Sequence, residues 1–180
     1  IDDSLRKVFA ALDRWDVVML FSDHGEEFWD HGSFGHGHTL YEELMRVPLV
    51  VRAPGLTPRR VSEPVSLLDL TPTVLDLLRR PVKGLDGQSL VPLLRGDPAA
   101  RVRFAQRALP MGWPLYGTVR WGVLTGQRKY NTLGSQEFLY DLALDPGERI
   151  NRVAGRGWAE TASHRAALGK ALTRDRLQAM

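Results

Sequence analysis

The feature that most constrains the fold is a short, continuously apolar run that ends in a polar turn. Residues 16–21 read DVVMLF, and Ser22-Asp23-His24-Gly25 follows at once. A run of this length between polar residues is typical of a strand buried on both faces of a parallel sheet. A second such run is VPLVV at 47–51, where Pro48 marks the strand's first residue or a sheet edge because it lacks an amide donor.

Helical patterns accompany these strands. Apolar residues recur at helical spacing within residues 4–12, and Thr71-Pro72 reads as a hydroxyl cap followed by proline at the first turn of a helix reaching Leu78. A short helical turn is expected within 84–98. Helices alternating with buried strands predict an α/β fold.

The pattern changes near residue 101. Short runs separated by Gly-containing turns predict strands at 103–107, 116–124, 128–131 and 138–142, with Gly126-Gln127 as a hairpin turn. The last segment, 157–180, is rich in Ala, Leu and Arg and predicts a terminal helix. We therefore expect two domains, 1–100 and 101–180, the second being a small, mainly antiparallel subdomain that ends in a helix.

Composition excludes several classes of function. Of 180 residues, 43% are hydrophobic and 25% charged, which is ordinary globular composition. No apolar run approaches the roughly 18 residues of a membrane span. The net charge is only +3 and the basic residues are scattered, so no nucleic-acid partner is expected. The absence of cysteine excludes disulfides, a thiol nucleophile and a thiolate metal site.

Four of the five histidines fall between Phe21 and Glu43. Asp23 and His24 directly follow the predicted strand, and ligands collect at the carboxyl ends of strands in open α/β sheets. A carboxylate suits hard divalent cations, and an imidazole widens the choice to Zn and Mn. The pattern therefore favours a divalent metal site at Asp23 and His24.

A structural reading stays open beside this one. An Asp-His-Gly turn is common, and each of His31, His36 and His38, taken alone, is compatible with the surface of a flexible loop. The acidic residues Glu26, Glu27 and Asp30 are expected to stay solvated or to cap backbone amides. Clustering after a buried strand is what favours a site.

The whole stretch FSDHGEEFWDHGSFGHGHTLYEELMRVPLVVRAPG resembles the metal-binding segment in the C-terminal half of the sulfatase catalytic domain, which belongs to the alkaline phosphatase superfamily. The resemblance continues through VSLLDLTPTVLDLL, GLDGQSLVPLLRG and FLYDLALDPGERIN, over roughly residues 16–153. It implies an α/β fold in which this chain is the C-terminal part of an alkaline-phosphatase-like sheet sandwiched by helices.

The resemblance also implies roles for individual residues. Asp23 and His24 would bind a divalent metal, usually Ca or Mg, with Mn or Zn possible because of the imidazole; the ion would hold the sulfate and polarise the ester. The family's sulfate-contacting lysine is matched by His36, with His38 as the alternate. Either histidine would be catalytic, donating a proton to the leaving oxygen.

Neighbouring residues receive smaller roles. Tyr41, Glu42 and Glu43 are expected to orient the loop, with Arg46 paired to one of the two carboxylates. Trp113, Tyr116 and Arg120 are candidates for substrate-pocket contacts, although a role in the subdomain core is an equal alternative.

The implied function is metal-dependent hydrolysis of a small-molecule or glycan sulfate ester. The family's nucleophile, a formylglycine made within Cys/Ser-x-Pro-x-Arg, is expected in an N-terminal half that this chain does not carry. The chain alone is then expected to be inactive and to expose an open, apolar sheet edge. Alternatives are a phosphodiesterase, phosphonate hydrolase or phosphotransferase of the same superfamily, or a non-catalytic accessory domain. Substrate, oligomeric state and compartment stay open, export being plausible from the family alone.

Overall fold

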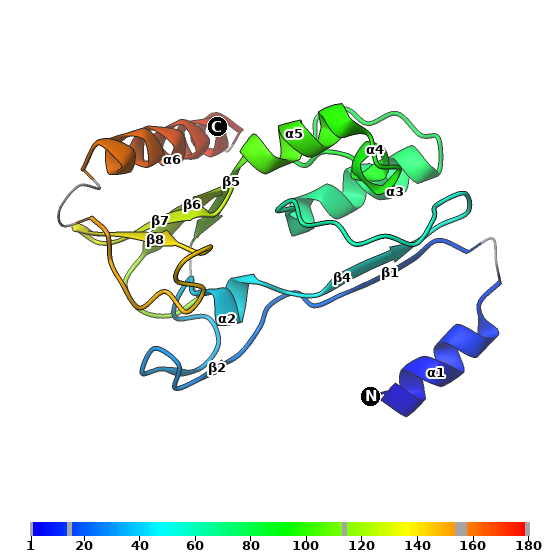
Figure 1. Ribbon diagram of the computed structural model, residues 1–180, viewed down its shortest axis with the longest axis horizontal. Coiled ribbons are helices and arrows are strands. Elements are labelled where there is room, and N and C mark those ends of the chain that lie inside the picture. Colours follow the sequence, from blue (N-terminus) through cyan, green and yellow to red (C-terminus); the bar gives the residue numbers. More distant parts are fainter. Residues whose placement is uncertain (1, 14–15, 113–114, 154–157, 179–180) are drawn as a thin grey trace. The chain divides into compact units, whose positions relative to one another are not determined.

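The computed structural model describes residues 2–13, 16–112, 115–153 and 158–178 (Figure 1). By their contacts, the residues form two compact units. Unit 1 comprises residues 1–22, 48–62 and 66–100, and unit 2 comprises residues 23–47, 63–65 and 101–180. This grouping differs from the expected division at residue 100, because the histidine-rich segment 23–47 and the short segment 63–65 belong with the C-terminal residues. The two-domain boundary itself stays a prediction.

Unit 1 is built around one pair of strands. Its elements are α1 (Asp2–Ala11), β1 (Val18–Phe21), β4 (Leu49–Arg52), η1 (Leu67–Asp69), α3 (Leu70–Leu77) and α4 (Val91–Leu94). The two strands pair antiparallel, with Val18 opposite Arg52 and Phe21 opposite Leu49. The expectation of a parallel pair is therefore wrong. A parallel pair needs a crossover, usually a helix, whereas residues 22–48 contain only a short hairpin and one helical turn before the chain returns.

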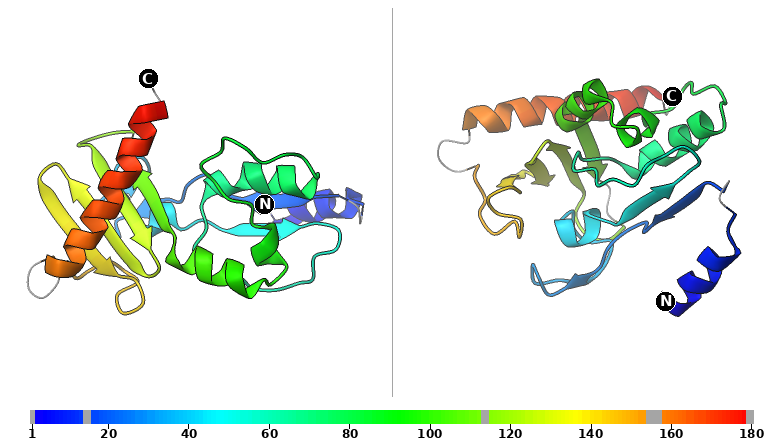
Figure 2. Two further views of the ribbon diagram at one scale, coloured as in Figure 1. Left: turned by 90° about the horizontal axis from the view of Figure 1, so that it is seen from above. Right: turned by 45° about the vertical axis from the view of Figure 1, so that its right-hand side comes forward.

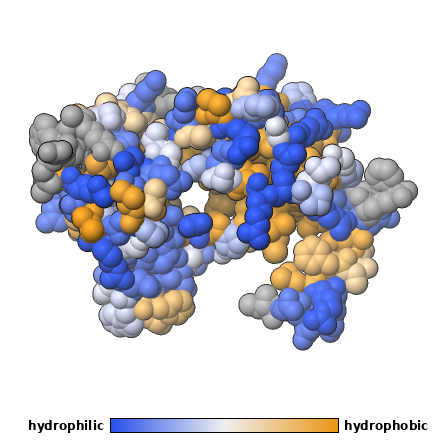
Figure 3. All heavy atoms as spheres, in the orientation of Figure 1, coloured by the Kyte–Doolittle hydropathy of each residue, from blue (hydrophilic) through white to orange (hydrophobic). Residues whose placement is uncertain are grey.

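The strand pair of unit 1 is only partly covered. Leu20 is 36% exposed, Phe21 46% and Val50 56%, so β1 is not buried on both faces as its apolar sequence predicts. Figure 3 shows apolar side chains at the surface around these strands and on α1. The open apolar surface expected from the sequence is thus present in the chain.

The start of α3 lies upstream of the predicted Thr71 cap. Ser66 is the N-cap of the preceding turn η1, and Ser66 and Asp69 form a reciprocal capping box. The buried Asp69 carboxylate accepts the amide of Ser66 at 2.8 Å and that of Gln88 at 2.8 Å. Asp69 therefore serves the backbone, and it also ties the helix to the loop before α4.

Unit 2 contains a four-stranded antiparallel sheet in the order β5-β6-β7-β8. Its strands are β5 (Ala108–Gly112), β6 (Arg120–Thr125), β7 (Arg128–Leu133) and β8 (Gln136–Asp141). The predicted hairpin at Gly126-Gln127 is confirmed, with Gly126 at φ +59°. The terminal helix α6 (Trp158–Gln178) is also confirmed, and it lies across one face of this sheet (Figure 2, left). Its Leu168 packs into a core with Val123, Tyr130 and Leu139.

One predicted strand is a helix. Residues 103–107 were expected to be extended, but α5 runs over Pro98–Gln106 and β5 begins only at Ala108. The Asp97 carboxylate accepts the amide of Ala99 at 2.8 Å. This is an N-cap followed by proline at the first turn, a combination that starts helices. Ala100 and Phe104, four residues apart, are both fully buried.

The histidine-rich segment contributes three small elements to unit 2. They are β2 (Glu27–Phe28), β3 (Phe34–Gly35) and α2 (Glu42–Met45), and β2 pairs antiparallel with β3. Overall the chain is a mixed α/β protein with a C-terminal antiparallel sheet and a terminal helix, as predicted. In the part of the chain that the structure describes, no helix combines the length and apolarity that a membrane crossing requires.

Candidate functional site

The turn that carries Asp23 and His24 is anchored by backbone hydrogen bonds. The amide of Gly25 donates to the carbonyl of Leu44 at 2.9 Å, and the amide of Glu26 donates to the carbonyl of Glu43 at 3.0 Å. A Cβ atom on Gly25 would lie 1.9 Å from the Glu43 carbonyl oxygen. Only glycine permits this close approach, which sets the turn directly against the start of α2.

The ring of His24 is oriented by a hydrogen bond at one of its nitrogens. Its Nδ1 lies 2.7 Å from the carbonyl oxygen of Gly25. A carbonyl only accepts hydrogen bonds, so Nδ1 carries a hydrogen, and in the neutral ring Nε2 is then the nitrogen with the lone pair. Nε2 lies 3.8 Å from Oδ2 of Asp23, whose other oxygen accepts the His24 amide at 3.1 Å.

These two residues fit a shared divalent cation. A donor nitrogen and a carboxylate oxygen 3.8 Å apart can both lie at bonding distance from one ion of about 2.0–2.4 Å bond length. A ring whose second nitrogen is held by a carbonyl is also the usual outer-shell arrangement of a histidine ligand. Among the described residues there is no group of three or more such side chains that could hold an ion. The described residues thus offer a pair of ligands rather than a complete site.

His36 lies beside this pair. Its ring stacks on that of His24, with centroids 4.2 Å apart and planes at 25°. Its Nδ1 lies 3.3 Å from Oε1 of Glu26. An ionised carboxylate only accepts, so Nδ1 of His36 donates to Glu26. This bond orients the ring and leaves Nε2 to contact a different group. Glu26 is therefore more than the solvated side chain that was expected.

The structure separates His38 from that group. The ring of His38 lies against Tyr116, with centroids 5.3 Å apart, and the Tyr116 amide donates to the Gly37 carbonyl at 2.8 Å. Gly37 has φ +82°, and a Cβ there would lie 3.2 Å from Leu115. The backbone thus holds the 116 region close to the loop, and His38 faces a different environment from His36.

His31 is not a surface residue of a flexible loop. Its ring stacks on Tyr41 with centroids 3.6 Å apart, and only 11% of its side chain is exposed. Nδ1 lies 2.5 Å from Oε1 of Glu43, and Nε2 lies 3.0 Å from the carbonyl oxygen of Gly147. His31 and Glu43 therefore fasten the loop to the segment after β8.

A buried ion cluster fastens the same loop to the sheet. Lys129 on β7 is fully buried, and its Nζ lies 2.9 Å from Oε1 of Glu42 and 3.1 Å from Oε1 of Glu148. Glu148 also accepts the Glu42 amide at 2.7 Å. Burial raises the pKa of the Glu148 carboxyl, and the Lys129 ammonium opposes that rise. This confirms that Glu42 and Glu43 orient the loop, although their partners are Lys129 and His31.

Two further expectations about charged residues are wrong. Arg46 forms no ion pair with Glu42 or Glu43 in the described structure, since other residues hold both carboxylates. Glu27 is not solvated but fully buried, because β2 turns it inward. One of its carboxylate oxygens accepts the Thr39 hydroxyl at 2.9 Å.

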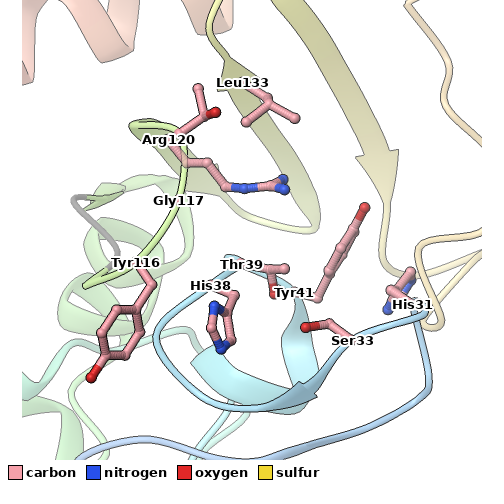
Figure 4. Close-up of a pocket in the computed structure, with 10 residues that line it drawn as sticks. His31, Ser33, His38, Thr39, Tyr41, Tyr116, Gly117, Arg120 and Leu133 are labelled. Atoms are coloured by element: carbon pink, nitrogen blue, oxygen red, sulfur yellow. The ribbon is translucent and has the colours of Figure 1, made fainter.

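An open hollow of about 340 Å³ lies beside His38 in unit 2 (Figure 4). The histidine-rich loop provides His31, Ser33, His38, Thr39 and Tyr41, and the facing wall provides Tyr116, Gly117, Thr118, Arg120 and Leu133. Tyr116 and Arg120, two of the sequence candidates for a pocket, thus line one. The third, Trp113, lies outside the described residues.

The sulfatase family model matches residues 1–79. Arylsulfatase K of Gallus gallus is 34% identical over 168 residues, which covers 83% of this chain and 31% of that protein. The chain thus spans about a third of the length of this relative.

Solved structures agree in fold. A 2-O GAG sulfatase superposes with a TM-score of 0.82 at 29% identity, covering 97% of this chain and 40% of that one. Phosphonate monoester hydrolase of Agrobacterium radiobacter superposes with a TM-score of 0.72 at 26% identity. The match covers 99% of this chain and 38% of that one. With these relatives and the Asp-His turn at the end of a strand, the chain belongs to the sulfatase family.

Proposed function

We propose that the intact protein is a metal-dependent sulfuric ester hydrolase. In this reaction water replaces the alcohol on sulfur: the bond between sulfur and the alcohol oxygen breaks, and the alcohol leaves with a proton. The observation that carries the proposal is the arrangement of His24, whose Nδ1 is held by Gly25 while Nε2 faces Asp23 at 3.8 Å. Family membership supports the same chemistry.

Asp23 and His24 would supply two ligands of the cation. Ca or Mg is the first expectation, and the imidazole nitrogen also suits Mn or Zn. When bound, such an ion holds the sulfate oxygens and draws electron density from the ester. The chain contains no Cys/Ser-x-Pro-x-Arg sequence, so in this proposal the formylglycine nucleophile and the remaining ligands come from sequence outside these 180 residues. The 180-residue chain alone would then lack turnover.

His36 would act on the leaving group. Glu26 accepts from Nδ1, so Nε2 is the atom that faces the sulfate, and with the ring protonated at both nitrogens Nε2 donates its proton to the leaving oxygen. His38 is the alternate donor, but its ring lies against Tyr116 rather than beside His24. The substrate class is a sulfated small molecule or glycan.

The decisive experiment measures hydrolysis of 4-nitrophenyl sulfate by the intact protein before and after chelation, followed by return of Ca, Mg, Mn or Zn. We expect activity to disappear with chelator and to return with one of these ions. Asp23→Asn and His24→Ala should each lower activity by at least about 100-fold and weaken metal affinity. Asp86→Asn, at an exposed carboxylate of unit 1, is the matched control.

Parallel assays distinguish the alternatives. Turnover of phenyl phosphonate or phosphate diesters without turnover of sulfate would assign the protein to the phosphonate hydrolase and phosphodiesterase branch. Hydrolysis of none of these esters, unaffected by added metal, would favour an accessory domain. Either result would overturn the sulfatase assignment.

A further inference from the structure

We propose that the hollow beside His38 binds the alcohol part of the sulfate ester and that Arg120 selects esters carrying a second anionic group. This inference rests on the proposed sulfatase function and names the substrate class more closely. The shared chemistry is a carboxylate or a second sulfate placed on a ring such as a sugar.

The first observation behind this proposal is the positive charge that Arg120 brings to the hollow. Two other cations of unit 2 are already neutralised, since Arg101 pairs with Glu63 at 2.6 Å and Arg165 pairs with Glu137 at 2.7 Å. Arg120, by contrast, has no side-chain ion pair or hydrogen bond among the residues that the structure describes. Figure 4 shows its guanidinium projecting toward Thr39 and Tyr41. An unpaired guanidinium in a hollow is suited to a carboxylate or sulfate, which it can bind through two parallel hydrogen bonds.

The remaining lining fits a polar ring. Ser33 and Thr118 bring hydroxyl groups that can both donate and accept, as the hydroxyls of a sugar require, whereas the Thr39 hydroxyl donates to Glu27 and can only accept. Tyr116, 59% exposed, adds an aromatic face on which the apolar side of a ring can pack. The volume, about 340 Å³, lies at the small end of ligand sites and suits about one ring.

The position of the hollow connects it to the reaction. His38 forms part of its wall, and His38 lies two residues along the chain from His36. A sulfate near His36 would place the alcohol part of the ester on the His38 side of the loop. Tyr116 is held there by its hydrogen bond to Gly37. Arg120 is therefore a specificity-determining residue in this proposal, distinct from the metal pair.

The test compares matched substrates on the intact, metal-loaded protein. A hexuronate 2-O-sulfate is compared with the corresponding hexose 2-O-sulfate, in which a hydroxymethyl group replaces the carboxylate, and with a disulfated hexose. We expect Arg120→Ala to lower the ratio of kcat/KM for the anionic ester over the neutral one by about 10- to 100-fold, mainly through KM. Arg120→Lys should keep part of the preference, because it keeps the charge but loses the fork of donors. Comparison of the hexuronate 2-O-sulfate with the disulfated hexose shows whether the hollow prefers a carboxylate or a second sulfate.

Two controls keep the outcomes distinct. Arg149→Ala, at an exposed arginine of the same unit, should leave the substrate ratio unchanged. Titration of the desulfated uronate into the wild type and Arg120→Ala, followed by calorimetry, measures binding without turnover. An unchanged ratio and unchanged binding in Arg120→Ala, with sulfatase activity present, would overturn this inference alone. Absence of sulfatase activity in the wild type would overturn the proposed function instead.

Discussion

Nδ1 of His31 lies 2.5 Å from a carboxylate oxygen of Glu43, and its other ring nitrogen lies 3.0 Å from the Gly147 carbonyl. Because the carbonyl only accepts, Nε2 must carry a hydrogen. The bond to Glu43 then requires one more proton, on the ring or on the carboxyl. His31 and Glu43 thus share a proton in one hydrogen bond, and His31 links the histidine-rich loop to the segment after β8 through its second hydrogen bond.

This link should contribute to stability. His31→Ala removes both hydrogen bonds and leaves the largely buried Glu43 carboxylate without its partner, so the free energy of unfolding should fall by about 1–3 kcal/mol. Urea unfolding measures the change. His38→Ala serves as the matched control, because the His38 ring contacts Tyr116 but has no side-chain hydrogen bond in the described structure. Equal losses in the two variants would contradict the link.

Lys129 should be more sensitive still. Lys129→Met leaves the buried Glu148 carboxylate without its cation, and breaking a buried pair from one side costs about 3–5 kcal/mol. The double variant Lys129→Met with Glu148→Gln removes both charges and should recover part of the loss. Chemical denaturation of the wild type, the two single variants and the double variant gives the coupling energy directly. A coupling near zero would show that the two charges do not stabilise each other.

Acid should weaken the attachment of α6. Hydrogen bonds from Arg165 and then Tyr130 lower the pKa of the Glu137 carboxyl from its ordinary value of 4.5 to about 2. A pKa lower in the folded than in the unfolded state stabilises the fold above about pH 4.5. That stability is lost as the pH falls from 4.5 through 2. Unfolding midpoints of the wild type and Glu137→Gln, measured across this window, should converge as the pH falls. A constant difference between the two proteins would argue against the shift.

The turn that carries Asp23 and His24 should not tolerate a side chain at Gly25. In Gly25→Ala the new Cβ would lie 1.9 Å from the Glu43 carbonyl, so the turn must move away from α2. Under the proposed function, we expect the intact protein to lose most of its hydrolase activity and to bind metal more weakly. Gly169→Ala, in α6 with no atom within 4 Å of the added Cβ, should stabilise slightly or leave stability unchanged. Normal activity in Gly25→Ala would show that the position of the turn does not matter.

Local patterns predicted much of the secondary structure correctly. The strand before Asp23, the hairpin at Gly126-Gln127 and the terminal helix follow from hydrophobic runs and turn residues, which act over a few positions. The sequence does carry a start signal for helix α5, with Asp97 as the cap and Pro98 in the first turn. It was missed because Gly96 and Pro98 were interpreted as the end of the preceding helical turn.

Partners distant in sequence could not be predicted. Lys129 lies 87 residues from Glu42, and His31 lies 116 residues from Gly147. Nothing near either residue in the sequence distinguishes it from a solvated side chain. The same holds for Glu27, which looks like one of several acidic loop residues until β2 turns it inward. Glu26 had a weak signal, since it lies two residues after His24 within the histidine cluster.

The amino-acid sequence by itself determined the family, the order of most elements and the placement of Asp23 and His24 after a strand. These depend on local periodicity, turn chemistry and ordered motifs. Only the tertiary structure decided that the two strands of unit 1 run antiparallel, that His36 stacks beside His24 while His38 faces a hollow, and that buried charges hold the loop. Those outcomes depend on contacts between residues far apart in the chain, and burial, which decides whether a charge is solvated or must find a partner, exists only once the chain has folded.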